Sequence, residues 1–263
     1  MTSFYSLASS SSGNCSVYCG GGRVILIDAG TNTKYIRGAL GQLGLCLGDV
    51  TDILITHTHT DHISALPVLS KHCKAPVLCS RQAHPLLLPH CNHEEVGTFV
   101  PGEAFWLGEV RITPFATPHD SPGSCGFTLE CEAGKLAYCT DLGCVTPAIY
   151  GHLKGARTVF LESNHDVYML KNGEYPYYLK QRILSDRGHL SNDAAAETAC
   201  ALVEDGAERV ILAHLSEHNN TPRCALRETR EALEKMGALG AVEVTAAPKR
   251  EAGPAVVLAR SAG

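Results

Sequence analysis

Short apolar runs rich in β-branched residues recur along this chain of 263 residues, and each of them ends at an ionisable residue. Uninterrupted apolar runs of this length are typical of strands that are buried on both faces of a sheet, with helices covering the sheet. In open α/β sheets, ligands bind beyond the carboxyl ends of the strands, so these ionisable residues are expected to line one crevice. The runs are Arg23–Ile27 before Asp28, Asp52–Ile55 before His57, Leu136–Cys139 before Asp141, Val159–Leu161 before Glu162, and Val210–Leu212 before His214.

Helices and a set of antiparallel strands are predicted between these runs. The segment Asn192–Asp205 has a capping Asn at its first residue and apolar residues on one face, and a second helix opens at Thr221, which precedes a proline. Ile36–Leu43 is the third predicted helix. The alternating, turn-rich texture of residues 103–141 favours antiparallel strands, and Ser9–Asn14 is expected to turn a hairpin. The prediction is therefore an α/β fold with a mixed sheet.

The composition sets limits on the class of protein. A chain of this length is routinely one α/β domain, so we expect a single domain over residues 1–263. No apolar stretch approaches a membrane span, and Met1–Tyr5 lacks the start of a signal peptide, so the cytoplasm is expected. The 12 cysteines are scattered, which favours reduced thiols over disulfides or a thiolate-bound metal. The net charge of −5 excludes a global attraction to nucleic acid, so any polyanion must be held by a local basic patch or by metal ions.

The segment Thr56–His62 reads Thr-His-Thr-His-Thr-Asp-His and follows an apolar run directly. In an extended segment, alternate side chains point the same way, so His57 and His59 can bind one ion from one side. Asp61 and His62 would then turn toward a second ion. The alternative is an ordinary polar loop in a histidine-rich chain, but the spacing of the four side chains favours a metal site.

Four ligands are too few for two ions, so further ligands are expected elsewhere in the chain. His119 lies in a proline-bounded loop, where a buried structural histidine would be unusual. Asp141 follows a predicted strand, and its carboxylate can bind both ions, whereas an ordinary turn aspartate is the alternative. His214 follows another predicted strand, and a buried neutral histidine is its alternative.

The order of these residues resembles the metallo-β-lactamase fold, an αββα sandwich of mixed sheets with the metal site at one sheet edge. Further motifs resemble the YycJ (WalJ) group of this fold, over nearly the whole chain up to about Gly237; members of this group are described as exonucleases that act on DNA from the 5′ end. No motif of the group was found in residues 238–263. The motifs that carry this resemblance are Ser6–Asn14, Leu161–Asp166, Arg182–Asn192 and Ala213–Asn220.

The resemblance implies two divalent metal ions, Zn²⁺ or Mn²⁺, held by seven ligands, with one more carboxylate orienting them from behind. The implied set is His57, His59 and His119 for one ion, Asp61, His62 and His214 for the other, Asp141 as the bridge, and Asp28 behind the ligands. The choice between Zn²⁺ and Mn²⁺ stays open, since histidine and carboxylate ligands suit both.

Two residues outside the ligand set are expected to act in the reaction together with Asp61. Two ions generate a bridging hydroxide that can attack phosphorus, but a sugar oxygen still leaves badly as an alkoxide. His189, in Gly188–Ser191, could deliver a proton to it if Glu162 holds the imidazole protonated, and ribonuclease Z uses a similar pair. The alternative is that His189 is a solvated residue ahead of a helix.

Basic and aromatic residues between Glu162 and His189 suit a nucleic-acid substrate. The basic ones are expected to contact phosphates, and the tyrosines offer faces for unpaired bases. The alternative is a solvated helix with tyrosines packing onto the body of the protein. The residues are Lys171, Lys180, Arg182 and Arg187 with Tyr168, Tyr175, Tyr177 and Tyr178, and the further candidates for phosphate or end recognition are Asn14, Asn164 and Asn220.

These expectations favour a metal-dependent phosphodiesterase, specifically a 5′ to 3′ DNA exonuclease that binds DNA, with no organic cofactor and no membrane association. One alternative is a small-molecule hydrolase of the same fold, acting on a cyclic nucleotide, another phosphodiester, a thioester or a lactam. A non-catalytic scaffold is the other, although a full ligand set argues against it. The preference for DNA over RNA and the oligomeric state are left open by the residues.

Overall fold

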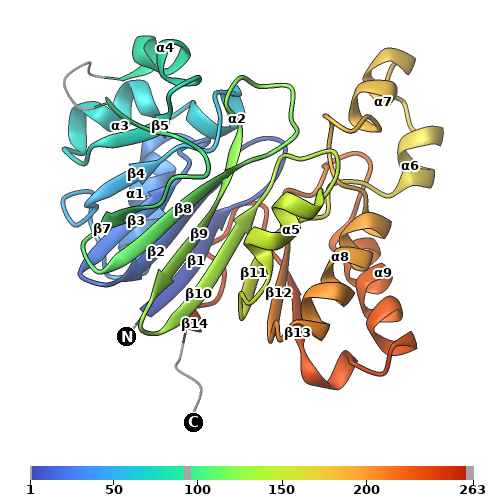
Figure 1. The fold of residues 1–263 in the computed structure, drawn as a ribbon. Helices are drawn as coiled ribbons and strands as arrows, with labels where there is room; N and C mark the ends of the chain where they lie inside the picture. The colour runs from blue at the N-terminus through green and yellow to red at the C-terminus, as the bar shows by residue number, and fades with distance from the viewer. Residues whose placement is uncertain (1, 92–95, 259–263) are drawn as a thin grey trace. The chain divides into compact units, whose positions relative to one another are not determined.

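The computed structural model describes residues 2–91 and 96–258 (Figure 1). The chain forms two compact units, and each unit is made of separate stretches of the sequence. Unit 1 contains the described residues of Met1–Ala116, Ser121–Gly134 and Pro248–Gly263, and unit 2 contains Thr117–Asp120 and Lys135–Ala247. That residues 1–263 make one domain stays a prediction.

Unit 1 contains a mixed seven-stranded sheet of order β14-β1-β2-β3-β4-β5-β6. The neighbours from β14 to β3 pair antiparallel, and those from β3 to β6 pair parallel. The Ser-rich segment joins β1 and β2 as an antiparallel pair, so the predicted hairpin is confirmed. The strands are β1 (Thr2–Ala8), β2 (Cys15–Gly20), β3 (Arg23–Ile27), β4 (Asp52–Leu54), β5 (Val77–Ser80), β6 (Val96–Phe99) and β14 (Val256–Leu258).

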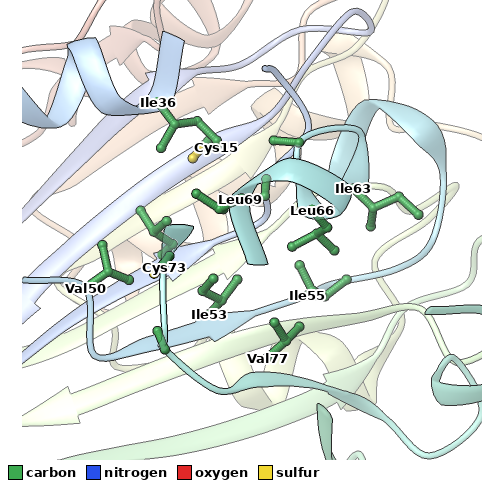
Figure 2. Close-up of a cluster of buried hydrophobic side chains, with 14 of the residues drawn as sticks. Cys15, Ile36, Val50, Ile53, Ile55, Ile63, Leu66, Leu69, Cys73 and Val77 are labelled. Atoms are coloured by element: carbon green, nitrogen blue, oxygen red, sulfur yellow. The ribbon is translucent and has the colours of Figure 1, made fainter. Parts of the chain in front are cut away.

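Helices of unit 1 bury their apolar faces against this sheet. In Figure 2, Ile36 of α1 lies beside Cys15 of β2, and Leu66 and Leu69 of α3 lie in the same buried cluster as Ile53 of β4. Each fully buried Leu or Ile side chain stabilises the fold by about 1.5–3 kcal/mol, so this cluster fixes the helices to the strands. The helices are α1 (Thr33–Gln42), α2 (Thr60–Ile63), α3 (Leu66–His72), α4 (His84–Leu87) and the 3₁₀ turn η1 (Leu88–His90).

Unit 1 also contains three antiparallel strands, which confirms the prediction from the alternating pattern. β8 pairs with β7 on one side and with β9 on the other. The strands are β7 (Phe105–Leu107), β8 (Val110–Ala116) and β9 (Cys125–Cys131).

Unit 2 has parallel strands in the order β10-β11-β12-β13, with helices between them. Ala199 of α8 and Leu233 of α9 pack with Leu212 of β12 in one buried cluster. The strands are β10 (Gly134–Cys139), β11 (Thr158–Glu162), β12 (Arg209–Ala213) and β13 (Glu243–Ala246), and the helices are α5 (Pro147–Leu153), α6 (Val167–Asn172), α7 (Tyr177–Ile183), α8 (Asn192–Glu204), α9 (Pro222–Lys235) and the 3₁₀ turn η3 (Leu239–Ala241).

The predicted starts of α8 and α9 are correct to within one residue, whereas α1 begins at Thr33, three residues before the predicted Ile36. Thr221 caps α9 as predicted, since its hydroxyl accepts a hydrogen bond from the backbone N–H of Cys224. The prediction that Asn192 caps α8 is wrong, because the cap is Ser191. The Asn192 side chain is buried and is occupied by hydrogen bonds to Ser163 and Asn220, so it does not bond the helix backbone.

The cysteines and the helices bear on two expectations for the whole chain. All 12 cysteines are free thiols, as predicted, and Cys15, Cys73, Cys79, Cys125 and Cys139 are buried. Among the helices in residues 2–91 and 96–258, none has the length and apolarity that crossing a bilayer would require.

Candidate metal centre

Three of the predicted site residues follow the ends of strands in a left-handed backbone conformation. The φ angles are 62° at Asp28 after β3, 60° at Asp141 after β10 and 54° at His214 after β12. Within the described part of the chain, no other non-glycine residue has a positive φ. Such a conformation costs roughly 1–2 kcal/mol for a residue with a Cβ, and strain of this kind gathers at functional sites.

In unit 1, Asp28 organises the histidine-rich segment. The carboxylate is fully buried, and its oxygens accept hydrogen bonds from the backbone N–H of Thr56 at 2.8 Å and from the Thr56 hydroxyl. Nδ1 of His62 lies 2.8 Å from Oδ2 of Asp28. Because the Thr56 hydroxyl proton goes to Asp28, its oxygen accepts from Nδ1 of His57 at 3.0 Å. Asp28 therefore contacts one predicted ligand, His62, directly, and its place behind bound metal ions stays a prediction.

The other unit 1 candidates lie at the start of α2. The rings of His57 and His59 are 4.7 Å apart, and those of His57 and His62 are 4.1 Å apart. Asp61 Oδ2 lies 3.4 Å from Nε2 of His62. Asn14 donates from Nδ2 to Asp61 Oδ2 at 3.2 Å and lies 3.0 Å from Nε2 of His62. The four side chains of the motif therefore gather within unit 1.

In unit 2, Asp141, Glu162, His189 and His214 bring one possible ligand atom each to within 4.8 Å of the others. Glu162 is fully buried at the centre of this group. Its Oε1 lies 2.8 Å from Nδ1 of His189 and 2.7 Å from Nδ1 of His214. Nδ1 of His214 is also 3.4 Å from Oδ1 of Asp141. The predicted pairing of Glu162 with His189 is present, and Glu162 also holds a predicted ligand.

The surroundings of Glu162 favour its ionised form although the side chain is buried. Burial disfavours its charged form, but the charges of His189 and His214 and their hydrogen bonds outweigh burial and hold the pKa of Glu162 below its ordinary value. Its Oε2 accepts hydrogen bonds from the backbone N–H groups of Leu142 at 3.0 Å and Leu190 at 3.1 Å. A buried carboxylate with every oxygen bonded can orient two imidazoles at once.

His119 lies in the same unit as this cluster. Its Nδ1 donates to the carbonyl oxygen of Gly188 at 3.0 Å, and its Nε2 lies 3.7 Å from Oδ1 of Asp141. Burial lowers the pKa of His119, with Asp141 opposing the shift, so the neutral imidazole that a metal ion needs is favoured.

The donor chemistry fits divalent metal ions. In His62, His119 and His214, Nδ1 bonds a carboxylate or a carbonyl oxygen. Such a bond places the proton on Nδ1 and makes Nε2 the nitrogen that carries the lone pair, which is how metal-binding histidines are generally oriented.

The residues expected to bind substrate are engaged inside their own units. Asn164 is buried and donates from Nδ2 to the carbonyl oxygen of His214 at 2.8 Å. Asn220 donates to the carbonyl oxygens of Ser163 and Asn164. Lys180 donates to two carbonyl oxygens at the end of α6, and Arg182 pairs with Asp120. Contact of these residues and of Asn14 with substrate stays a prediction.

His165 and Asn192 are buried polar residues whose roles the sequence analysis missed. Both ring nitrogens of His165 are buried without a hydrogen-bond partner, and burial lowers its pKa to about 4. Asn192 exchanges two hydrogen bonds with Asn220. The only indication in the sequence was the run of three polar residues, Ser163–His165, that follows the apolar strand residues and Glu162. In the structure all three side chains are buried.

Comparisons with known proteins identify the class of protein. The family model of the Metallo-beta-lactamase superfamily matches residues 10–214. The metallo-beta-lactamase fold protein YhfI of Bacillus subtilis superposes with a TM-score of 0.75 at 16% identity, covering 97% of this chain and 100% of that one. These matches confirm the predicted fold class.

Two curated relatives identify the family to which the chain belongs within this superfamily. The chain is 35% identical over 237 residues to the exodeoxyribonuclease YycJ of Bacillus anthracis, covering 89% of this chain and 90% of the relative. It is 31% identical over 224 residues to the exodeoxyribonuclease WalJ of Streptococcus pneumoniae serotype 2, strain D39, covering 83% of each. The chain therefore belongs to the metallo-beta-lactamase superfamily and, within it, to the family of YycJ and WalJ.

Proposed function

We propose that this protein is a divalent-metal-dependent DNA exonuclease that degrades DNA from the 5′ end. The curated relatives are named exodeoxyribonucleases, and the observation that carries the proposal is the Glu162–His189 pair. His189 keeps 19% of its side chain exposed, whereas Glu162, Asp141 and His214 of the same cluster are buried. A histidine held by a carboxylate and open to solvent suits proton delivery to a substrate oxygen.

The ligands of the two units are proposed to act as one set that binds two ions. One ion would be held by His57, His59 and His119, the other by Asp61, His62 and His214, and Asp141 would be shared. The family model that matches residues 10–214 covers all seven of these residues. When bound, Zn²⁺ or Mn²⁺ would activate water and neutralise charge on the phosphoryl oxygens.

The chain's own residues have separate tasks in this proposal. Asp28 and Glu162 fix the orientation of His62 and His214 through Nδ1. His189, with Nδ1 held by Glu162, gives a proton from its imidazolium to the leaving sugar oxygen as the P–O bond breaks. The leaving group departs as an alcohol, and the step gains on the order of 10²- to 10⁴-fold in rate.

Two substitutions separate metal binding from proton transfer. We expect His57→Ala to lose metal and activity together, whereas His189→Ala keeps the metal and slows single-turnover cleavage by about 10²- to 10⁴-fold. His72→Ala is the matched control, since His72 is exposed on α3 and should change neither property. If His189→Ala cleaves DNA at the parental rate, His189 is not the proton donor.

The substrate is tested with end-labelled DNA and RNA, single- and double-stranded, with Zn²⁺ and Mn²⁺ in turn. Release of the 5′ label as the first product supports the proposed polarity. Turnover of a cyclic nucleotide or a thioester without cleavage of DNA would favour a small-molecule hydrolase, and less than one bound ion per chain would favour a scaffold. The cytoplasm is the proposed location of the enzyme.

A further inference from the structure

Three tyrosines on two short helices of unit 2 are largely exposed to solvent. The exposed fractions are 76% for Tyr168 on α6 and 77% and 74% for Tyr177 and Tyr178 on α7. Figure 1 shows the two helices next to each other in the chain path that leads to α8. No residue of α7 is buried, so this helix is not held in place by an apolar core.

Polar contacts hold α7 instead. Lys180 donates from Nζ to the carbonyl oxygens of Lys171 at 2.9 Å and Gly173 at 2.7 Å, which ties α7 to the end of α6. Arg182 pairs with Asp120, and Arg187 donates to the carbonyl oxygen of His119 at 3.1 Å. The helix is therefore fixed to the loop that carries a predicted metal ligand, and the same segment continues to His189.

Packing of these tyrosines onto the body of the protein is excluded for three of the four. Tyr175 does pack, with its ring 5.6 Å from that of His218. The other three expose about three quarters of their surface, although an aromatic side chain gains stability when it is buried. Three exposed aromatic rings on two neighbouring helices are a feature that binding surfaces share.

The positive charge of the segment Val167–Ile183 favours an anionic partner. Val167–Ile183 contains Lys171, Lys180 and Arg182 against the single acid Glu174, and with Asp120, which pairs with Arg182, the segment still carries one excess positive charge. The whole chain has a net charge of −5. Flat aromatic rings beside cations form the kind of surface that binds unpaired nucleic acid, because every base has a face on which a ring can stack. A duplex, whose bases are already stacked, gains less from such a surface.

We propose that Tyr168, Tyr177 and Tyr178 form a base-stacking surface for an unpaired DNA strand that extends from the catalytic residues. This inference rests on the proposed nuclease function and assigns the binding of single-stranded substrate to α6 and α7. Stacking is worth roughly 5- to 100-fold in affinity per base, so the surface sets KM rather than the chemical step.

The binding test uses a fluorescently labelled single-stranded oligonucleotide and the full-length protein in chelator, so that nothing is cleaved. We expect Tyr177→Leu and Tyr178→Leu each to weaken binding by about 5-fold or more, and Tyr177→Phe to keep it, because Phe retains the ring. The matched control is Trp106→Ser on β7, since Trp106 is 65% exposed but lies in unit 1. Equal affinity of the Leu variants and the parent would overturn the inference.

A strand without bases separates stacking from phosphate binding. The parent should bind an abasic oligonucleotide of the same length more weakly, and Tyr177→Leu should then cause no further loss. An equal loss on abasic and normal strands would show that the surface contacts the backbone and would contradict stacking.

Cleavage kinetics keep this inference distinct from the proposed function. In steady-state cleavage of a single strand, Tyr177→Leu should raise KM by about 5-fold or more and change kcat much less. A parent that cleaves no DNA refutes the nuclease function, whereas a parent that cleaves DNA with unchanged KM in the variants refutes only the stacking surface. Light scattering tests whether a second copy of the protein covers the tyrosines instead of DNA. A dimer in the parent that dissociates in Tyr177→Leu would assign the surface to that second copy and overturn the proposal.

Discussion

At the scale of single residues, the backbone is strained at Asp28, Asp141 and His214. Each adopts the left-handed conformation within two residues of the end of a strand, where glycine is the residue without strain. A glycine there would have no side chain to bind or orient an ion. The chemistry of the site therefore overrides the backbone preference at these positions.

Replacing Asp141 by Gly and by Ala tests this strain. Both variants delete the same carboxylate, so the difference between them reports the backbone alone. We expect Asp141→Gly to be more stable than Asp141→Ala by about 1 kcal/mol in the free energy of unfolding, measured by denaturant titration in chelator. At Asp52 in the extended strand β4, the order should reverse, with Gly less stable by about 0.5–1 kcal/mol. An Ala variant at position 141 as stable as the Gly variant would contradict the strain.

His165 makes stability depend on pH. Burial holds its pKa at about 4, against 6.5 in the unfolded chain, so the unfolded chain takes up a proton first as the pH falls. Its contribution to stability is fully present above pH 6.5 and is lost as the pH falls toward 4, by about 3 kcal/mol at most.

A non-ionisable side chain at position 165 should flatten this part of the pH profile. Urea unfolding of the metal-free parent and of His165→Phe at pH 7, 5.5 and 4 measures the difference, and His165→Gln is a second variant if Phe does not fit. Parallel profiles in the parent and both variants would show that His165 does not titrate between folded and unfolded states in this range.

At the scale of elements, the close approach of two backbone segments positions Asp61. A Cβ on Gly30 would lie 1.5 Å from the carbonyl oxygen of Asp61, which accepts a hydrogen bond from the backbone N–H of Asn14 at 2.8 Å. Only glycine allows the chain after β3 to pass this close to the start of α2.

Gly30→Ala is therefore expected to destabilise the fold by at least about 2 kcal/mol and to weaken metal binding. Gly38→Ala is the matched control, because a Cβ at Gly38 in α1 meets nothing within 4 Å. That substitution should stabilise the protein by about 0.5–1 kcal/mol, since Ala favours the helix. Calorimetry of both variants is the measurement, and similar melting temperatures would contradict the close approach.

The sequence predicted the strands that precede the site because each carries a buried apolar run that ends abruptly at an ionisable residue. The pairing of Glu162 with His189 was predicted from the need for a proton donor and from the resemblance to ribonuclease Z, not from a strand edge, because His189 lies between α7 and α8. The contact of Glu162 with His214 could not be predicted, since no pattern states which imidazole a carboxylate faces. The buried state of His165 was missed for a related reason: its neighbours in space come from segments that the local pattern does not connect.

At the scale of the whole molecule, the proposed ligands divide between two compact units. His57, His59, Asp61 and His62 come from unit 1, whereas His119, Asp141 and His214 come from unit 2. If the two groups act as one set, metal binding couples the stability of the units. Ions that bind only the folded chain stabilise it by about 3 kcal/mol when present at about 100 times Kd.

Trp106 is the single tryptophan of the chain and lies on β7 in unit 1, so its fluorescence follows the unfolding of that unit. We expect added metal to shift its unfolding midpoint upward in the parent. His119→Ala removes a proposed ligand from unit 2, and it should reduce this shift by half or more if His119 is, as proposed, the third imidazole of the ion assigned to His57 and His59. His72→Ala should leave the shift at the parental size. A full shift in His119→Ala would mean that unit 1 binds its ion without unit 2, and the joint ligand set would then be wrong.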